Sequence, residues 1–192
     1  MIIGPKKLLQ LVKTKKLVEG LAERELTNPE GAGFDLRLGE VYQISGKAFL
    51  GVNERETPKV KLVAKYSAFV PLSGTSTDKQ KSKINKITIR PGEFYLVTTI
   101  EKVNLPINIC ATFIPRTTTF RSGLFLRTGV AQPGYKGRLT FGLKNEGSVP
   151  VTLELGCRFA HAQFHWVDGG GNQYRGQWQG GRVTTRKREK QV

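Results

Sequence analysis

Gly31-Ala32-Gly33-Phe34-Asp35-Leu36-Arg37-Leu38-Gly39 is the stretch at which the pattern of the chain changes from helix-like to strand-like. Before it, residues 5 to 24 carry an apolar stripe that begins beside Pro5, and they predict one long helix or two short ones. From Gly33 onward, short alternating runs are separated by turn residues, the pattern of a mainly β sandwich or barrel-like fold. The expected strands are Phe34 to Leu38, Val41 to Ile44, Lys59 to Val63, Lys86 to Ile89, Glu93 to Thr99, Ile109 to Ile114, Leu124 to Arg127, Thr140 to Leu143, Val149 to Leu153 and Arg158 to Trp166.

Composition favours one folded domain followed by a tail. The 192-residue chain is 38% apolar, which is enough for a single core, and we expect the domain to span residues 1 to 168. Residues 169 to 192 are rich in Gly, Arg and Gln and have too little apolar content to fold alone, so they stay disordered or order on something else. Residues 73 to 83 are polar enough for a mobile loop or hairpin tip.

Apolar runs and cysteines in the sequence indicate where the protein resides and whether it forms disulfides. It has no apolar run of about 18 residues and no signal-peptide pattern, so we expect a soluble cytoplasmic protein without membrane contact. Its two cysteines, Cys110 and Cys157, lie in apolar surroundings and are expected to be buried free thiols.

The chain is strongly basic. It has 31 Lys and Arg against 15 Asp and Glu, a formal net charge of +16, which favours an anionic partner. A polyphosphate and a nucleic acid both fit this charge. No aromatic residues interleave with the basic clusters as they do in a stacking platform for single strands.

Two stretches are candidates for a ligand site. Residues 115 to 124 hold two arginines and four hydroxyl side chains around a glycine, donors that suit phosphate oxygens, although a solvated loop has the same composition. Residues 129 to 137 predict a tight turn that presents backbone groups and one aromatic ring to a flat ligand, or else an ordinary hairpin.

Other catalytic signatures are missing from the sequence. It contains no Walker loop, no GxGxxG turn, no zinc-deaminase signature and no Cys/His cluster with metal-ligand spacing. His161 and His165 share one face of a predicted strand, where packing or surface roles are commoner than general-base roles.

Taken in order, these stretches resemble the motifs of the trimeric dUTPase and dCTP deaminase superfamily, with dCTP deaminase-like proteins the closest. Residues 31 to 39 blend the AGYDL of dUTPases with the DLRLG of dCTP deaminases, and residues 116 to 124 resemble RSSLARLGL. Residues 132 to 137 resemble DPG(F/W)xG, residues 156 to 164 the G(M)RIAQLxF strand, and residues 174 to 180 the YxGKYQG tail.

The resemblance implies a fold, an activity and an assembly. The fold is a distorted β-barrel or jelly-roll-like subunit (β-clip) with an N-terminal helix, assembled as a homotrimer with active sites between subunits and a C-terminal segment that closes over the ligand. The activity is that of a nucleotide hydrolase, a dCTP deaminase that converts dCTP to dUTP or a dUTP diphosphatase. The ligand is a deoxynucleoside triphosphate, dCTP or dUTP, bound with Mg²⁺.

Site residues follow by position from the same resemblance. Arg116 and Thr118 are expected to hold phosphate, Thr117 to help position the attacking water, and Arg121 to lie beside the reacting base. Asp35 has a family role closer to magnesium or to structure. The nucleotide-binding set is completed by Ala131, Gln132, Tyr135, Tyr174, Gln177, Gln179 and either Arg175 or Arg182.

The general base departs from the family pattern. The strand that aligns with the TLEL of dCTP deaminases is Thr140-Phe141-Gly142-Leu143, which puts Gly142 at the glutamate position, and Gln132 aligns with the catalytic aspartate of dUTPases. Neither Gly nor Gln can take a proton from water and return it. No Asp or Glu occurs between Glu101 and Glu146, so a replacement must come from elsewhere, with Glu146, Asp35 and His161 as candidates.

Three functions therefore remain open from sequence. The first is a hydrolase with an atypical general base. The second is a non-catalytic homologue that binds a deoxynucleoside triphosphate. The third is a basic protein of this fold that associates with nucleic acid through its charge.

Overall fold

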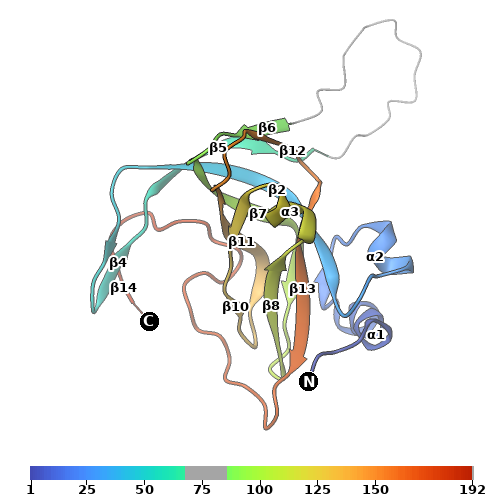
Figure 1. Ribbon diagram of the computed structural model, residues 1–192. Helices are drawn as coiled ribbons and strands as arrows, with labels where there is room; N and C mark the ends of the chain where they lie inside the picture. The colour runs from blue at the N-terminus through green and yellow to red at the C-terminus, as the bar shows by residue number, and fades with distance from the viewer. Residues whose placement is uncertain (68–85, 192) are drawn as a thin grey trace, which may run out of the picture.

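The chain folds around one strongly curled sheet, with its N-terminal helices on one side (Figure 1). This computed structural model describes residues 1–67 and 86–191. The loop expected at residues 73 to 83 lies outside the described residues. The mainly β prediction is confirmed, and the described helices are short.

The N-terminal region contains two helices with a strand between them. Helix α1 (Pro5–Lys15) ends at Lys16, which takes a left-handed conformation with φ of 52°. Strand β1 (Val18–Glu19) then pairs with β7 through Val18 and Val103, and helix α2 (Glu23–Thr27) follows. Of the two options that the apolar stripe left open, the one long helix is wrong, because the backbone turns at Lys16 to reach the sheet.

The main sheet has nine strands, in the order β10-β8-β13-β2-β7-β11-β9, with β1 added beside β7 and β5 beside β2. Two small sheets, β12-β6 and β14-β4-β3, lie at its margins. The remaining bounds are β2 (Phe34–Ser45), β3 (Phe49–Leu50), β4 (Glu54–Glu56), β5 (Lys59–Lys65), β6 (Lys86–Ile89), β7 (Phe94–Asn104), β8 (Ile109–Pro115), α3 (Thr117–Arg121), β9 (Leu124–Arg127), β10 (Val130–Ala131), β11 (Lys136–Asn145), β12 (Val151–Glu154), β13 (Arg158–Trp166) and β14 (Glu189–Lys190).

Strand β2 joins two runs that the sequence separates at Gly39. A Cβ at this glycine would lie 2.8 Å from the carbonyl oxygen of Thr99 on β7, so only glycine lets the two backbones approach here. The strand continues through the close contact into Val41, which is fully buried. A glycine that sequence reading takes as a strand end is therefore a packing residue inside one long strand.

The core lies inside the curl of the sheet. Phe34, Leu36 and Leu38 alternate inward from β2 and meet Phe159 and Phe164 of β13, all of them fully buried or nearly so. The rings of Phe34 and Phe164 meet edge to face, with centroids 6.1 Å apart.

The two cysteines are free thiols, as expected, but each is only partly buried. Cys110 lies between the buried Ile109 and Ala111, so the alternation of β8 turns it away from the core. In the part of the chain that the structure describes, no helix has the length and apolar character needed to cross a membrane.

Candidate functional site

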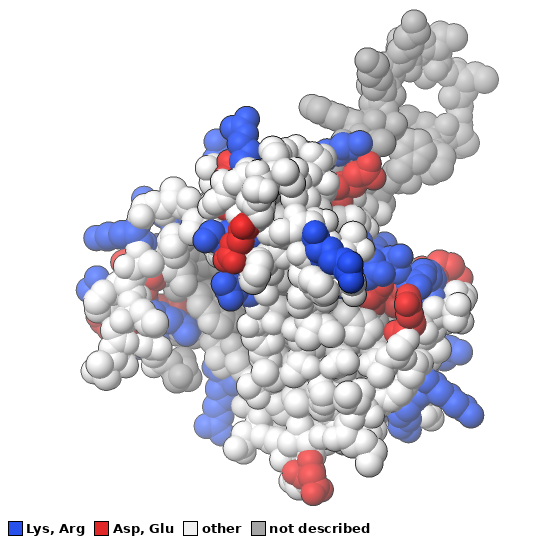
Figure 2. Space-filling model, in the orientation of Figure 1, with Lys and Arg blue, Asp and Glu red and all other residues white. Residues whose placement is uncertain are grey.

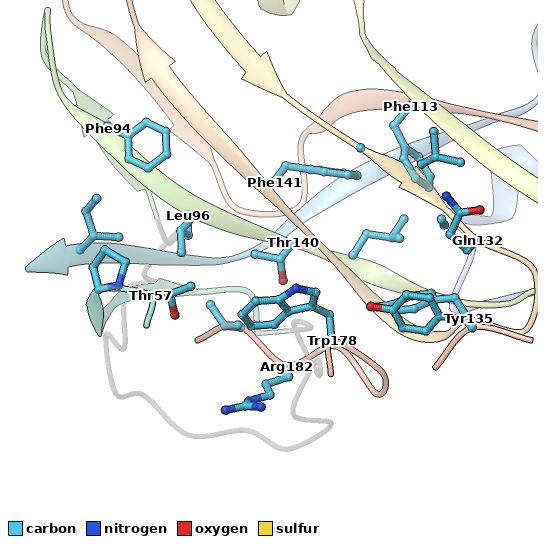
Figure 3. Close-up of a pocket in the computed structure, with 18 residues that line it drawn as sticks. Thr57, Phe94, Leu96, Phe113, Gln132, Tyr135, Thr140, Phe141, Trp178 and Arg182 are labelled. Carbon is cyan, nitrogen blue, oxygen red and sulfur yellow. The ribbon is translucent and has the colours of Figure 1, made fainter. Parts of the chain in front are cut away.

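A cavity of about 510 Å³ lies between one face of the sheet and the C-terminal segment (Figure 3). Its wall is mostly aromatic and aliphatic, the usual lining of a site that holds a small organic ligand. The lining comes from β2, the loop after β4, strands β7, β8, β10 and β11, the turn before β11, and the tail. Its members are Ile44, Thr57, Pro58, Phe94, Leu96, Phe113, Gly129, Val130, Ala131, Gln132, Tyr135, Leu139, Thr140, Phe141, Tyr174, Trp178, Arg182 and Val183.

The tail covers this cavity because it is anchored near its end. Two guanidinium groups lie close to the indole ring of Trp178, that of Arg55 at 4.7 Å from the ring centroid and that of Arg182 at 5.7 Å. Both arginines also pair with Glu189, Arg182 at 2.8 Å and Arg55 at 3.5 Å. Strand β14 pairs with β4, so the last residues lie beside β4 at the side of the molecule away from α1 (Figure 1).

A second set of contacts holds the middle of the tail against β11 and the turn before it. The side-chain amide of Gln179 donates to the carbonyl of Gly134 at 3.0 Å and accepts from the backbone N–H of Lys136 at 2.9 Å. A Cβ at Gly137, which has φ of +140°, would lie 2.5 Å from the backbone nitrogen of Gly181. The tail and β11 therefore touch backbone to backbone at this point.

The structure brings one group of the expected nucleotide-binding residues together. Ala131, Gln132, Tyr135, Tyr174 and Arg182 all line the cavity. The rings of Tyr135 and Tyr174 meet edge to face with centroids 5.5 Å apart. Burial raises the pKa of Tyr135 to about 12, so this phenol is neutral near pH 7 and is no proton acceptor there.

Of the three expected glutamines, the two in the tail lie outside the cavity wall. Gln177 contacts Arg55, and Gln179 binds the backbone of the turn as described above. Both hold the tail in place in this arrangement.

The arginine and threonine stretch lies away from the cavity. Residues expected as a loop form the short helix α3, which is fixed by a 2.8 Å hydrogen bond from the Thr119 hydroxyl to the carbonyl of Phe159. Thr117, Thr118 and Arg121 are exposed and do not line the cavity of their own chain.

Asp35 is the centre of a buried charge cluster that includes Arg116. One of its oxygens lies 2.8 Å from Arg116 and 3.0 Å from Arg158, and the other lies 3.0 Å from Nδ1 of His161. Burial alone raises the pKa of Asp35, but the His161 hydrogen bond and the arginine charges outweigh it, so the pKa lies below its ordinary value. The cluster joins β2 to β13 and to the start of α3.

This geometry bears on three of the expected roles. One oxygen of Asp35 is engaged by two arginines and the other by His161, and its role as a magnesium ligand stays a prediction. His161, a candidate replacement base, has Nδ1 on Asp35 and does not line the cavity. Glu146 pairs with Arg127 at 3.3 Å and with Lys144 at 3.7 Å, also away from the cavity wall.

An aromatic ring stands where the family pattern puts the general base. A Cβ at Gly142 would lie 2.9 Å from Cε2 and Cζ of Phe94, so that ring fills the space beside the glycine. Among the described residues, no Asp, Glu or His lines the cavity. Within this chain, the described wall therefore provides no group suited to activating water.

Sequence reasoning missed several wall residues, above all Phe94, Thr140 and Trp178. Trp178 lies within the tail motif and was the detectable signal, because a lone tryptophan in a Gly-rich segment needs an apolar place to pack. Phe94 and Thr140 lie in ordinary strand patterns, and nothing local distinguishes them.

Lys and Arg side chains do not gather in one stripe on the face drawn in Figure 2. They are scattered over it, with Asp and Glu among them. Binding of nucleic acid through the net charge stays a prediction.

Comparisons with known proteins define the class. A probable deoxyuridine 5'-triphosphate nucleotidohydrolase of Methanothermobacter thermautotrophicus is 30% identical over 155 residues, 81% of this chain and 89% of that protein. A dCTP deaminase of Pyrococcus furiosus is 28% identical over 181 residues, 93% of this chain and 95% of that protein. The crystal structure of 2'-deoxycytidine 5'-triphosphate deaminase from Agrobacterium tumefaciens has the same fold, with a TM-score of 0.62 at 16% identity; the match covers 87% of this chain and 49% of that one.

A family model described as dCTP deaminase-like matches residues 2–166. The chain belongs to this family, within the dUTPase and dCTP deaminase superfamily that its motifs indicate. Its relatives are named as enzymes of both kinds, deaminases and dUTP hydrolases.

Proposed function

We propose that the chain binds a deoxynucleoside triphosphate, dCTP or dUTP, in the tail-covered cavity and acts as a dCTP deaminase-like nucleotide hydrolase with an atypical water-activating group. The observation that carries this proposal is the cavity itself. It offers aromatic and aliphatic walls for the base and sugar, and it is built from the turn and tail stretches whose sequences resemble motifs of the superfamily.

The phosphate contacts in this proposal come partly from a second subunit. Arg182 lies in the cavity wall, whereas Thr117, Thr118 and Arg121 are exposed on α3. We propose a homotrimer in which α3 of one subunit reaches the cavity of the next. Exposed apolar side chains on neighbouring elements support such a contact surface, namely Ile114, Phe120, Phe125 and Val130.

Magnesium enters this proposal only with the ligand. No described residue of the cavity wall is a carboxylate, and the described residues include no cluster of three or more His, Cys, Asp or Glu able to hold a metal. Mg²⁺ is commonly held by substrate phosphates and water together with one or two carboxylates. The wall does not fit a protein-held ion, so Mg²⁺ would arrive on the triphosphate.

A second candidate function is binding without turnover. Deamination at C4 of a pyrimidine requires a group that takes a proton from water and returns it to the ring and the leaving amine. The aromatic ring beside Gly142 and the lack of Asp, Glu and His in the described wall favour this candidate. Turnover then requires a base from outside the described wall, and a neighbouring subunit is one source of it.

Two measurements test the proposal in order. Calorimetric titration with dCTP and with dUTP in the presence of Mg²⁺ decides whether either nucleotide binds; no heat and no competition with any deoxynucleoside triphosphate would reject the proposal. Chromatography of the same mixtures after incubation separates the candidates, since uracil products or pyrophosphate mean hydrolysis and full recovery of the nucleotide means binding alone.

Returning a carboxylate to the expected general-base position makes the turnover measurement more decisive. The double variant Gly142→Glu with Phe94→Ala returns a carboxylate to the strand and removes the ring that blocks it. Deamination by this variant, with none by the Phe94→Ala control, means that the scaffold is otherwise complete. Light scattering on a sizing column gives the mass of the assembly, and a monomer that turns over substrate would contradict the trimer.

A further inference from the structure

We propose that the hydroxyl group of Thr140 is a recognition group for the nucleoside part of the ligand, the base or the sugar. This inference rests on the proposed nucleotide binding and adds to it a residue that sets affinity through one neutral hydrogen bond. It concerns a side chain on β11 that lines the cavity two residues before Gly142.

The first observation is a hydroxyl group without a partner. The Oγ1 atom of Thr140 is buried, and it has no hydrogen-bond partner among the described residues. Buried polar atoms in folded proteins are almost always paired, and an unpaired one calls for an explanation such as a ligand or an unseen water. In Figure 3 this hydroxyl points toward the indole ring of Trp178, on the side of the cavity that the tail covers.

The surroundings of Thr140 explain why the tail cannot supply the missing partner. Its neighbours in the cavity wall include Phe94 and Leu96 from β7 and the tail residue Trp178, none of which accepts a good hydrogen bond from a hydroxyl in this arrangement. By contrast, the other threonine of the wall, Thr57, is fully engaged. Its hydroxyl lies 2.9 Å from the Thr184 hydroxyl and accepts from the Thr185 backbone N–H at 2.8 Å.

A neutral ligand group fits this place better than a phosphate. Ligand cavities combine an apolar wall with a few polar groups that fix orientation, and Thr140 is such a group in an aromatic wall. A phosphate beside it would need cationic partners, and Arg182, the one cation among the described wall residues, is paired with Glu189 at 2.8 Å. Carbonyl, amino and hydroxyl groups of a base or sugar need only the single hydrogen bond.

The chain offers a matched control for Thr140. Thr98 on β7 lies directly opposite Thr140 in the strand register, and its hydroxyl is likewise buried without a partner among the described residues. Thr98 does not line the cavity. The two substitutions Thr140→Val and Thr98→Val therefore remove the same chemical group from neighbouring places, only one of which meets the ligand.

The experiment is calorimetric titration of the full-length wild type and both variants with dCTP, dUTP, deoxycytidine and deoxyuridine. We expect Thr140→Val to weaken binding of a triphosphate and of its nucleoside by the same factor, about 3- to 10-fold, the usual effect of one neutral hydrogen bond. We expect Thr98→Val to bind within twofold of the wild type. Both variants should unfold at the wild-type temperature or above, because each loses an unpaired buried hydroxyl.

Each other outcome overturns the inference in a recognisable way. If the wild type binds the ligands and Thr140→Val binds them with the same affinity, the hydroxyl makes no ligand contact. A loss for triphosphates but not for nucleosides means that the group contacts phosphate. Equal losses in both variants mean a general effect on the sheet, and a wild type that binds none of the ligands removes the proposed function together with this inference.

Discussion

Adding a single methyl group at Gly142 tests whether the ring of Phe94 occupies the place of the missing acid. The new Cβ would lie 2.9 Å from two ring atoms of Phe94 and 3.3 Å from Cβ of Arg127, inside the roughly 3.5–4.0 Å at which carbon atoms pack. Overpacking of a core costs about 1–3 kcal/mol. Because the contacted atoms are the far end of a half-buried side chain that can turn, we expect the lower part of that range, about 1–2 kcal/mol.

The assay is a double-mutant cycle in urea or thermal unfolding, with Gly142→Ala, Phe94→Ala and the double variant. A loss of this size lowers Tm by roughly 2–8 °C in a domain of this length. Once the ring is gone, the cost of Gly142→Ala should fall below about 0.5 kcal/mol, which gives a coupling energy of about 1 kcal/mol. Gly129→Ala is the control, since an added Cβ at this glycine of the cavity wall meets nothing within 4 Å. A Gly142→Ala protein as stable as the wild type, with no coupling to Phe94, would refute the reasoning.

Two further predictions concern the charge cluster and the tail. Asp35→Asn leaves Arg116 and Arg158 without their carboxylate, and since these arginines are a quarter to a third exposed we expect a loss of about 2–4 kcal/mol in the free energy of unfolding by urea. The pKa of Asp35 lies below its ordinary value, so the ionised carboxylate contributes fully to the free energy of unfolding above about pH 4. This contribution is lost as the pH falls through the lower pKa of the folded state. Urea midpoints that decline equally with falling pH in the wild type and in Asp35→Asn would contradict this. Trp178→Ala removes the ring that contacts two arginines, and we expect trypsin to cut the tail at residues 186 to 188 faster than in the wild type. Cleavage at an unchanged rate would mean that the β14–β4 pairing alone holds the tail.

Strands were largely predictable because their local pattern and their surroundings agree. Alternation bounded by turn residues gave β6 at Lys86–Ile89 and β13 at Arg158–Trp166 with the bounds that the structure has. The N-terminal helix was extended too far, because the pairing of Val18 with Val103 joins residues distant in sequence and no local pattern contains it. The same limit hides the continuity of β2 through Gly39, which depends on the approach of β7.

The residues of the candidate site were predictable where they belong to recognisable sequence motifs. They were not predictable where their contacts depend on how strands pair. The turn and tail motifs led to five residues of the cavity wall, Tyr135 and Tyr174 among them. The ring beside Gly142 could not be anticipated, because it depends on β7 pairing with β11 so that Leu96 lies opposite Gly142. The involvement of Arg116 with Asp35 likewise follows from the pairing of β13 with both β2 and β8, which sequence spacing does not encode.

The backbone contact between β11 and the tail should couple the evolution of residue 137 to that of residues 180 and 181. A side chain of any size at residue 137 would collide with the backbone at Gly180 and Gly181, since even a Cβ lies 2.5 Å from the nitrogen of Gly181. In homologous proteins, a residue other than glycine at the position of Gly137 should therefore occur together with a tail that is missing or follows another path. Covariation of these positions would record, in sequence alone, which family members keep the cavity covered in this way.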